Sequence, residues 1–153
     1  MNKKIILFAG ILFVSLLAIN SVSAAQYVTH DFDGYFTMQV PDDVTFQKDV
    51  NTAVGENNFI TYQNENIVIM YCDSFFVSEN SSTYFIQTIF EELNPDLSTC
   101  HESQEDGLLI LEPTTNNDLN FITVGKCSGN KVLIIVGDDL ELIKGMAKSA
   151  KFN

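Results

Sequence analysis

The chain has 153 residues and a formal net charge of −12, from 20 acidic and 8 basic side chains. So acidic a surface repels phosphate, which excludes nucleic acid as a partner and disfavours anionic lipid surfaces. The chain has 12 phenylalanines and no tryptophan, a composition that favours rings buried in a core over an exposed stacking platform.

Residues 1–25 have the pattern of a secretory signal peptide. Two lysines precede an apolar run over residues 5–19, and small residues follow, so we expect cleavage after Ala24 or Ala25. The run is about fifteen residues long, short of the roughly twenty that a membrane-spanning helix needs. We therefore expect residues 26–153 to form a single domain that is secreted or displayed at the extracytoplasmic cell surface, without stable membrane insertion after cleavage.

The first half of that domain predicts mainly strands. Residues 26–34 are polar and are expected to form a lead-in, and residues 49–57 contain a glycine among polar residues and predict a loop. The Asn64-Glu65-Asn66 triplet predicts the turn of a β-hairpin whose second strand, apolar on both faces, is expected to be central and covered. The strands expected here are residues 35–40, 44–48, 59–63 and 67–72.

The second half predicts a helix, a set of strands and a final helix. The apolar spacing after Ser81 or Ser82 predicts a helix that ends near Leu93, before a proline. The closing helix is expected over residues 138–151, with aspartates at its start and lysines at its end, the order that its dipole favours. Between the helices we expect strands at residues 97–103, 107–112, 119–127 and 131–136.

This order of elements predicts the α+β class. We expect an antiparallel β-sheet with helices packed on it.

The three cysteines favour a disulfide, because the signal peptide implies an oxidising compartment. If the strands after the first helix run as a meander, Cys72 and Cys127 lie at strand ends on the same edge of the sheet. We therefore expect a Cys72–Cys127 bridge, with Cys100 as the candidate free thiol. The alternative is that all three are buried thiols that fill the core.

No constellation of catalytic, cofactor-binding or metal-ligating residues is expected. Cys100 and His101 are neighbours on a predicted strand, so they point to opposite faces and His101 cannot easily activate the thiol. Together with Cys72 and Cys127 they lack the short paired spacing of a structural zinc site. Asp31-Phe32-Asp33-Gly34 resembles the start of a calcium loop but lacks its later ligands, so a solvated acidic turn is expected.

Asn80-Ser81-Ser82 is a candidate N-glycosylation sequon in a polar stretch, at the start of the first predicted helix. The alternative is that these residues cap that helix.

Two stretches resemble the PsbP-like and DcrB-like domains. The strand Phe36–Pro41, with its proline turn and the following Phe46, is similar to their opening, and residues 143–152 are similar to their final helix. The resemblance implies an α/β/α sandwich in an exported, usually non-enzymatic accessory protein. The chain lacks the lipid-attachment cysteine of the DcrB-like lipoproteins, so no lipid anchor is expected.

These observations lead to a secreted or cell-surface accessory domain that acts by binding, without catalysis, on an unknown protein or cell-envelope component. Two alternatives stay open: a cysteine-based redox protein or enzyme, and a calcium-dependent surface-binding protein.

Overall fold

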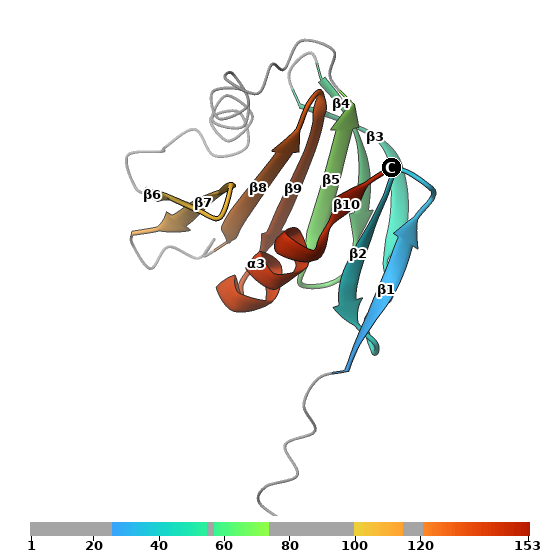
Figure 1. The fold of residues 1–153 in the computed structure, drawn as a ribbon, viewed down its shortest axis with the longest axis horizontal. Coiled ribbons are helices and arrows are strands. Elements are labelled where there is room, and N and C mark those ends of the chain that lie inside the picture. The colour runs from blue at the N-terminus through green and yellow to red at the C-terminus, as the bar shows by residue number, and fades with distance from the viewer. Residues whose placement is uncertain (1–25, 55–56, 74–99, 115–120) are drawn as a thin grey trace, which may run out of the picture.

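The structure, a computed structural model, describes residues 26–54, 57–73, 100–114 and 121–153 (Figure 1). These residues form ten strands and one helix. In chain order they are β1 (Tyr27–Phe32), β2 (Phe36–Pro41), β3 (Gln47–Val54), β4 (Asn57–Gln63), β5 (Val68–Asp73), β6 (Cys100–Glu105), β7 (Leu108–Pro113), β8 (Ile122–Ser128), β9 (Lys131–Gly137), α3 (Leu140–Ser149) and β10 (Lys151–Phe152).

The strands form two antiparallel sheets. The larger has seven strands in the order β3-β4-β5-β9-β8-β7-β6, and the smaller has three in the order β1-β2-β10. Figure 1 shows the smaller sheet and α3 side by side in one layer, in front of the larger sheet. Helix α3 contacts β2 in its own layer and β7, β8 and β9 in the layer behind. In the described residues the domain therefore has two layers, and one helix extends the smaller sheet.

An aromatic cluster joins the two layers. Phe32 stacks on Phe36 with ring centroids 4.6 Å apart, and the Tyr62 ring packs edge-on against Phe32 at 4.9 Å. Tyr71, on the neighbouring strand of the larger sheet, lies 5.5 Å from Phe36. All four side chains are buried, so each one removes a large apolar area from water at this interface.

The two faces of the larger sheet carry separate apolar clusters. Leu133 and Ile135 of β9 point toward the smaller sheet and α3, and Val132 and Ile134 alternate with them toward the opposite face. All four are fully buried. Strand β5 has the same arrangement, as its sequence predicted: it is buried on both faces and lies between β4 and β9.

Helix α3 is held at both ends by side chains. Asp139 is its N-cap, with a carboxylate that accepts from the Leu142 N–H at 3.0 Å, and the aspartates lie at the start of the helix as predicted. At the other end, the Lys126 ammonium donates to the carbonyls of Ala147, Lys148 and Ala150 at 3.0, 3.2 and 2.7 Å. The half-buried Lys126 thus adds donors to carbonyls at the end of the helix, of which that of Ala147 also accepts from the Ala150 N–H. Burial lowers the pKa of Lys126.

Several predicted elements are confirmed. The hairpin β4–β5, the strands β2, β7, β8 and β9, and the closing helix all lie within a few residues of their expected positions. Of the strand expected at 97–103, residues 100–103 lie in β6, and residues 97–99 are outside the described residues. The first predicted helix, the Asn80 sequon and the signal peptide lie outside the described residues.

The predicted α/β/α sandwich is wrong. In the described part of the chain, α3 is the one helix, and the layer that it shares is otherwise a second sheet. That sheet was missed because residues 26–34, expected as a lead-in, contain β1, of which only Phe32 is buried. The expected loop at 49–57 is also wrong: β3 continues to Val54 through a register shift between Val50 and Thr52.

Gly137 offers a test of the packing between β9 and α3. A Cβ at Gly137 would lie 2.9 Å from Cγ2 of the fully buried Ile143, so Gly137→Ala should lower the free energy of unfolding by about 1–3 kcal/mol. Gly145→Ala is the matched control, because nothing lies within 4 Å of its added methyl group on the exposed side of α3. It should raise the free energy by about 0.5–1 kcal/mol. Urea denaturation measures both, and shifts of the same sign would contradict this packing.

Candidate functional site

A polar groove lies between two turns that are far apart in sequence. One wall is the segment between β2 and β3, and the other is the turn that joins β4 to β5. The groove has a volume of about 640 Å³. Its lining residues are Asp43, Val44, Thr45, Gln47, Gln63, Asn64, Glu65 and Asn66.

Both walls are fixed by local hydrogen bonds. The Asn64 side-chain oxygen accepts from the N–H groups of Asn66 and Ile67 at 2.8 and 2.7 Å, and the Asn64 N–H donates to the Ile67 carbonyl. On the other side, the Val44 N–H donates to the Pro41 carbonyl at 3.2 Å. An asparagine that bonds its own turn in this way pre-forms the loop, so the groove is largely built before a ligand enters.

The chemistry of the groove is that of amides and carboxylates. Four of its eight lining side chains are Asn or Gln, two are Asp43 and Glu65, and none is basic. Amides can donate and accept, and the carboxylates accept. The lining therefore suits hydroxyl, amide or ammonium groups and opposes phosphate or carboxylate ligands.

A charged cluster joins the turn after β1 to Lys48 and Tyr62, the pair next to Gln47 and Gln63 along β3 and β4. The Asp33 carboxylate accepts from the Tyr62 hydroxyl at 2.8 Å and from the Lys48 ammonium at 2.7 Å. Lys48 also lies over the rings of Tyr35 and Tyr62, at 5.7 and 5.9 Å from their centroids. Hydrogen bonds from Lys48 and Tyr62 hold the pKa of Asp33 below its usual value, and the Asp33 carboxylate raises the pKa of Lys48. Both groups are therefore fixed in their charged forms.

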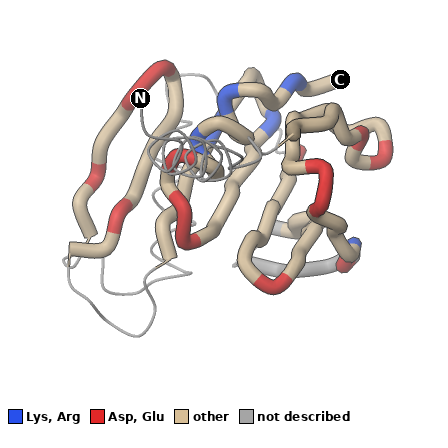
Figure 2. Tube along the Cα trace, turned by 90° about the horizontal axis from the view of Figure 1, so that it is seen from below, with Lys and Arg blue, Asp and Glu red and all other residues tan. Residues whose placement is uncertain are grey.

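A second charged cluster joins the β6–β7 turn to α3. Lys148 bonds Glu105 at 3.1 Å and Asp106 at 2.8 Å, and Lys144 reaches Glu105 at 3.3 Å and Glu141 at 3.0 Å. Figure 2 shows the lysines gathered on the C-terminal segment and the acidic residues spread over the turns. The sequence assigned these lysines to the helix dipole, and the structure adds that they clamp the β6–β7 turn.

The predicted Cys72–Cys127 bridge is wrong. Both cysteines pair in register with Val132, Cys72 from β5 and Cys127 from β8, so β9 lies between them. Two strand spacings place their Cα atoms about 10 Å apart, since neighbouring strands are about 4.8 Å apart. That separation exceeds the roughly 7 Å limit of a disulfide. Of the three buried thiols that the alternative expected, only Cys72 is fully buried, and the half-buried Cys127 packs against the same apolar cluster.

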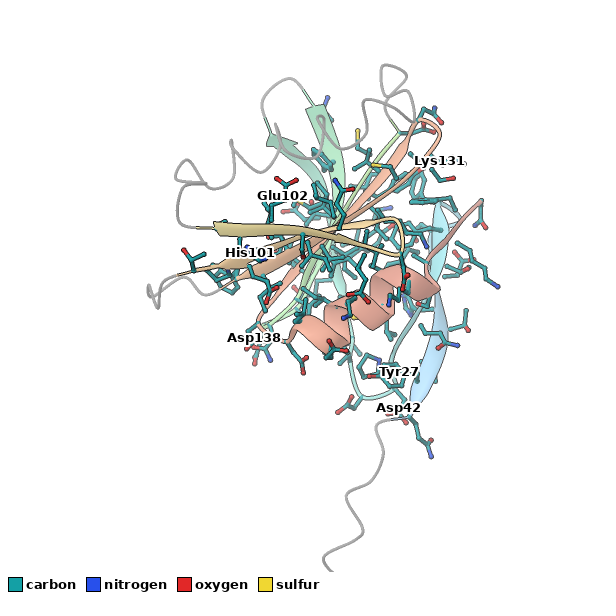
Figure 3. The ribbon with its side chains drawn as sticks, turned by 60° about the vertical axis from the view of Figure 1, so that its left-hand side comes forward. Tyr27, Asp42, His101, Glu102, Lys131 and Asp138 are labelled. Atoms are coloured by element: carbon teal, nitrogen blue, oxygen red, sulfur yellow. The ribbon has the colours of Figure 1, made fainter. Side chains whose placement is uncertain are left out.

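The remaining candidate residues are also dispersed. Cys100 and His101 are consecutive residues of β6, at the far edge of the larger sheet from Cys72. Figure 3 shows His101 on that strand, well away from Tyr27 and Asp42. No group of three potential metal ligands occurs among the described residues. Burial raises the pKa of the Cys72 thiol, which lowers its reactivity.

The Asp31-Phe32-Asp33-Gly34 stretch forms a hairpin turn. The Asp31 side chain accepts from the Gly34 N–H at 2.7 Å. Asp33 and Gly34 have φ values of 54° and 78°, the left-handed region that Asp-Gly pairs supply to tight hairpins. Its two carboxylates thus bond the turn itself and Lys48, and the turn is acidic as the sequence predicted.

The groove was not among the sequence-predicted sites. The β4–β5 turn was expected, but Val44, Thr45 and Gln47 of the other wall were expected in a strand over residues 44–48. The pairing of Gln47 with Gln63 joins two segments that were both expected as strands. The signal that could have found the groove was the clustering of four amides and two acids in residues 43–47 and 63–66. What the sequence did not reveal is that these two segments meet.

The chain resembles known proteins in fold and not in sequence. No protein-family model and no curated protein sequence matches it. Among solved structures it is similar to cyanobacterial PsbP (CyanoP) from Synechocystis sp. PCC 6803, with a TM-score of 0.50 and 12% sequence identity. The match covers 88% of this chain and 96% of that one. The chain therefore has a PsbP-like fold, as its opening and closing segments suggested.

Helix α3, the one helix among the described residues, falls short of the length and hydropathy that crossing a bilayer requires.

The Asp33–Lys48 pair predicts a measurable acid dependence. The folded-state pKa of Asp33 lies below its ordinary value of 3.8, so the pair stabilises the fold above that pH. The stabilisation is lost as the pH falls from 3.8 through the lowered pKa. Lys48→Met should return the Asp33 pKa toward 3.8, as measured by an NMR titration of its carboxyl carbon. Lys144→Met, which breaks the other cluster, should leave it unchanged, and an unaltered pKa in Lys48→Met would contradict the assignment.

Proposed function

We propose that this chain is a non-catalytic accessory domain of the extracytoplasmic space, which binds a partner protein or cell-envelope component through the polar groove. The observation that carries the proposal is the lining of the groove, which has amides and carboxylates from two fixed turns and no basic side chain. The part of the partner that enters is a neutral or cationic polar segment, since hydroxyl, amide and ammonium groups match this lining.

The states of the ionisable groups support a binding role over catalysis. Outside the groove, the pKa values of Asp33, Glu105 and Asp106 are lowered by lysine partners, and those of the lysines are raised in return. Catalytic acids and bases need pKa values moved toward the working pH, and these shifts go the opposite way. The raised pKa of Cys72 likewise argues against the alternative of thiol chemistry there.

The placement outside the cytoplasm rests on residues 1–25, whose pattern is that of an export signal. The net charge of residues 26–153 is 6 − 20 = −14, which favours a soluble, cation-attracting domain in that compartment. The likeness to cyanobacterial PsbP supports an accessory role by analogy of fold.

The groove can be tested with tri-lysine as a cationic probe and tri-glutamate as its anionic counterpart. Tri-lysine should shift the backbone amide resonances of Thr45, Gln47 and Glu65, and tri-glutamate should not. The double variant Asp43→Asn, Glu65→Gln should weaken the tri-lysine response about fivefold, since each exposed ion pair is worth roughly 0.2–1 kcal/mol.

The matched control is Asp138→Asn, Glu141→Gln, which removes the same charge from the exposed start of α3. It should bind tri-lysine as the unmodified chain does. Equal weakening in both double variants would show that net charge alone attracts the probe, and the groove would lose its assignment.

A further inference from the structure

Strand β1 is an open edge of the smaller sheet. It pairs with β2 on one side, and in the described residues no strand pairs with its other side. Residues 26–31 are all exposed, with Tyr27 at 50% and Val28 at 46%. An edge of this kind presents unpaired backbone groups and apolar side chains together, which is the template for adding another strand.

The other three sheet edges carry devices that block such addition. Strand β3 has a register shift between Val50 and Thr52 and a lysine at position 48, and β6 is polar along His101–Glu105. Strand β10 is two residues long. By contrast, β1 runs in continuous register over six residues without lysine or proline. Its one charged side chain, Asp31, bonds the Gly34 N–H.

The hydrogen bonds of β2 define which groups of β1 point outward. The Asp42 backbone N–H donates to the Gln26 carbonyl at 2.9 Å, so this pair is bonded across the ladder. The backbone N–H of Gln39, opposite Thr29, instead donates to the Ser149 hydroxyl on the other side of β2. Bonded and non-bonded pairs alternate in antiparallel sheets. The N–H and C=O groups of Tyr27, Thr29 and Asp31 therefore face the open edge.

The charges at the two ends of β1 select the occupant. Asp42 follows the partner of Tyr27, and Figure 3 shows these two residues together at one end of the strand. Asp31 lies at the other end. A second copy would bring a domain with the same net charge of −14 to this edge, so the two copies would repel each other. A strand with basic residues at its ends instead has a carboxylate near each of them, Asp31 on β1 itself and Asp42 across β1.

From these contacts we infer that β1 captures an extended polypeptide segment of another protein, with a β-branched centre and lysine or arginine at both ends, by antiparallel or parallel strand addition. This inference rests on the proposed function in so far as the domain acts by binding, and it does not require the groove. The main-chain bonds supply the affinity, and the flanking charges supply the selectivity.

The probe is a synthetic peptide of alternating valine and threonine with lysines at both ends. It should shift the amide resonances of Tyr27, Thr29 and Asp31 and give NOEs across the new ladder, whereas the same peptide with glutamates at its ends should not bind. Thr29→Pro removes an outward N–H without removing a bond to β2, so it should weaken binding about tenfold or more. Thr29→Val keeps the N–H and the branched side chain and should bind normally.

A second arm of the experiment leaves the protein unmodified, so it does not depend on a variant folding. It uses the lysine-flanked peptide with N-methyl groups at alternate residues, which should not bind to the open edge of β1. Unaltered binding in this arm or in Thr29→Pro would overturn the inference, as would sedimentation showing that the chain dimerises through β1. Thr29→Pro should also retain the tri-lysine response of the groove. A failure of strand addition is thereby distinguishable from a failure of the proposed function.

Discussion

The packing of Phe32 and Phe36 against Tyr62 is the contact on which the rest of the domain depends. The ring centroid of Phe32 lies 4.6 Å from that of Phe36 and 4.9 Å from that of Tyr62, and this cluster joins the smaller sheet to the larger one. Truncating one buried phenylalanine costs about 3–5 kcal/mol, a large part of a typical total stability of about 5–15 kcal/mol. The same contact brings Asp33 to the Tyr62 hydroxyl and fixes the position of β1. It thus positions β1, whose open edge is one of the two surfaces to which we assign binding.

Most of the lysines make contacts within the fold. Six lysines follow residue 25, and five of them lie in the last 28 residues. Four of these five bond other parts of the chain. Lys126 caps α3, Lys144 and Lys148 hold the β6–β7 turn, and Lys131 donates to the Asn153 carbonyl. These pairs leave the remaining acidic residues to set the character of the groove and of the ends of β1. A PsbP-like fold alone would not predict this, because fold and binding surface vary independently.

Sequence patterns predicted the elements with strong apolar periodicity and missed those without it. Strand β9 and helix α3 were found because their buried residues recur at the strand and helix periods. Strand β1 was missed because its pairing with β2 buries only Phe32, and no alternation marks it. The Cys72–Cys127 bridge failed for a different reason: both cysteines were placed at one sheet edge, but the insertion of β9 between their strands is set by tertiary packing and leaves no local trace.

Amide-resolved hydrogen exchange of β1 tests the central claim most directly, that this strand is held by β2 and the aromatic cluster on one side and is open on the other. The N–H groups of Val28 and His30 face β2 and should be protected, whereas those of Tyr27, Thr29 and Asp31 should exchange at rates near those of an unstructured chain. An alternating pattern would support the account. Equal protection of all five amides would show that the edge is covered, and uniformly fast exchange would show that β1 is not part of the sheet.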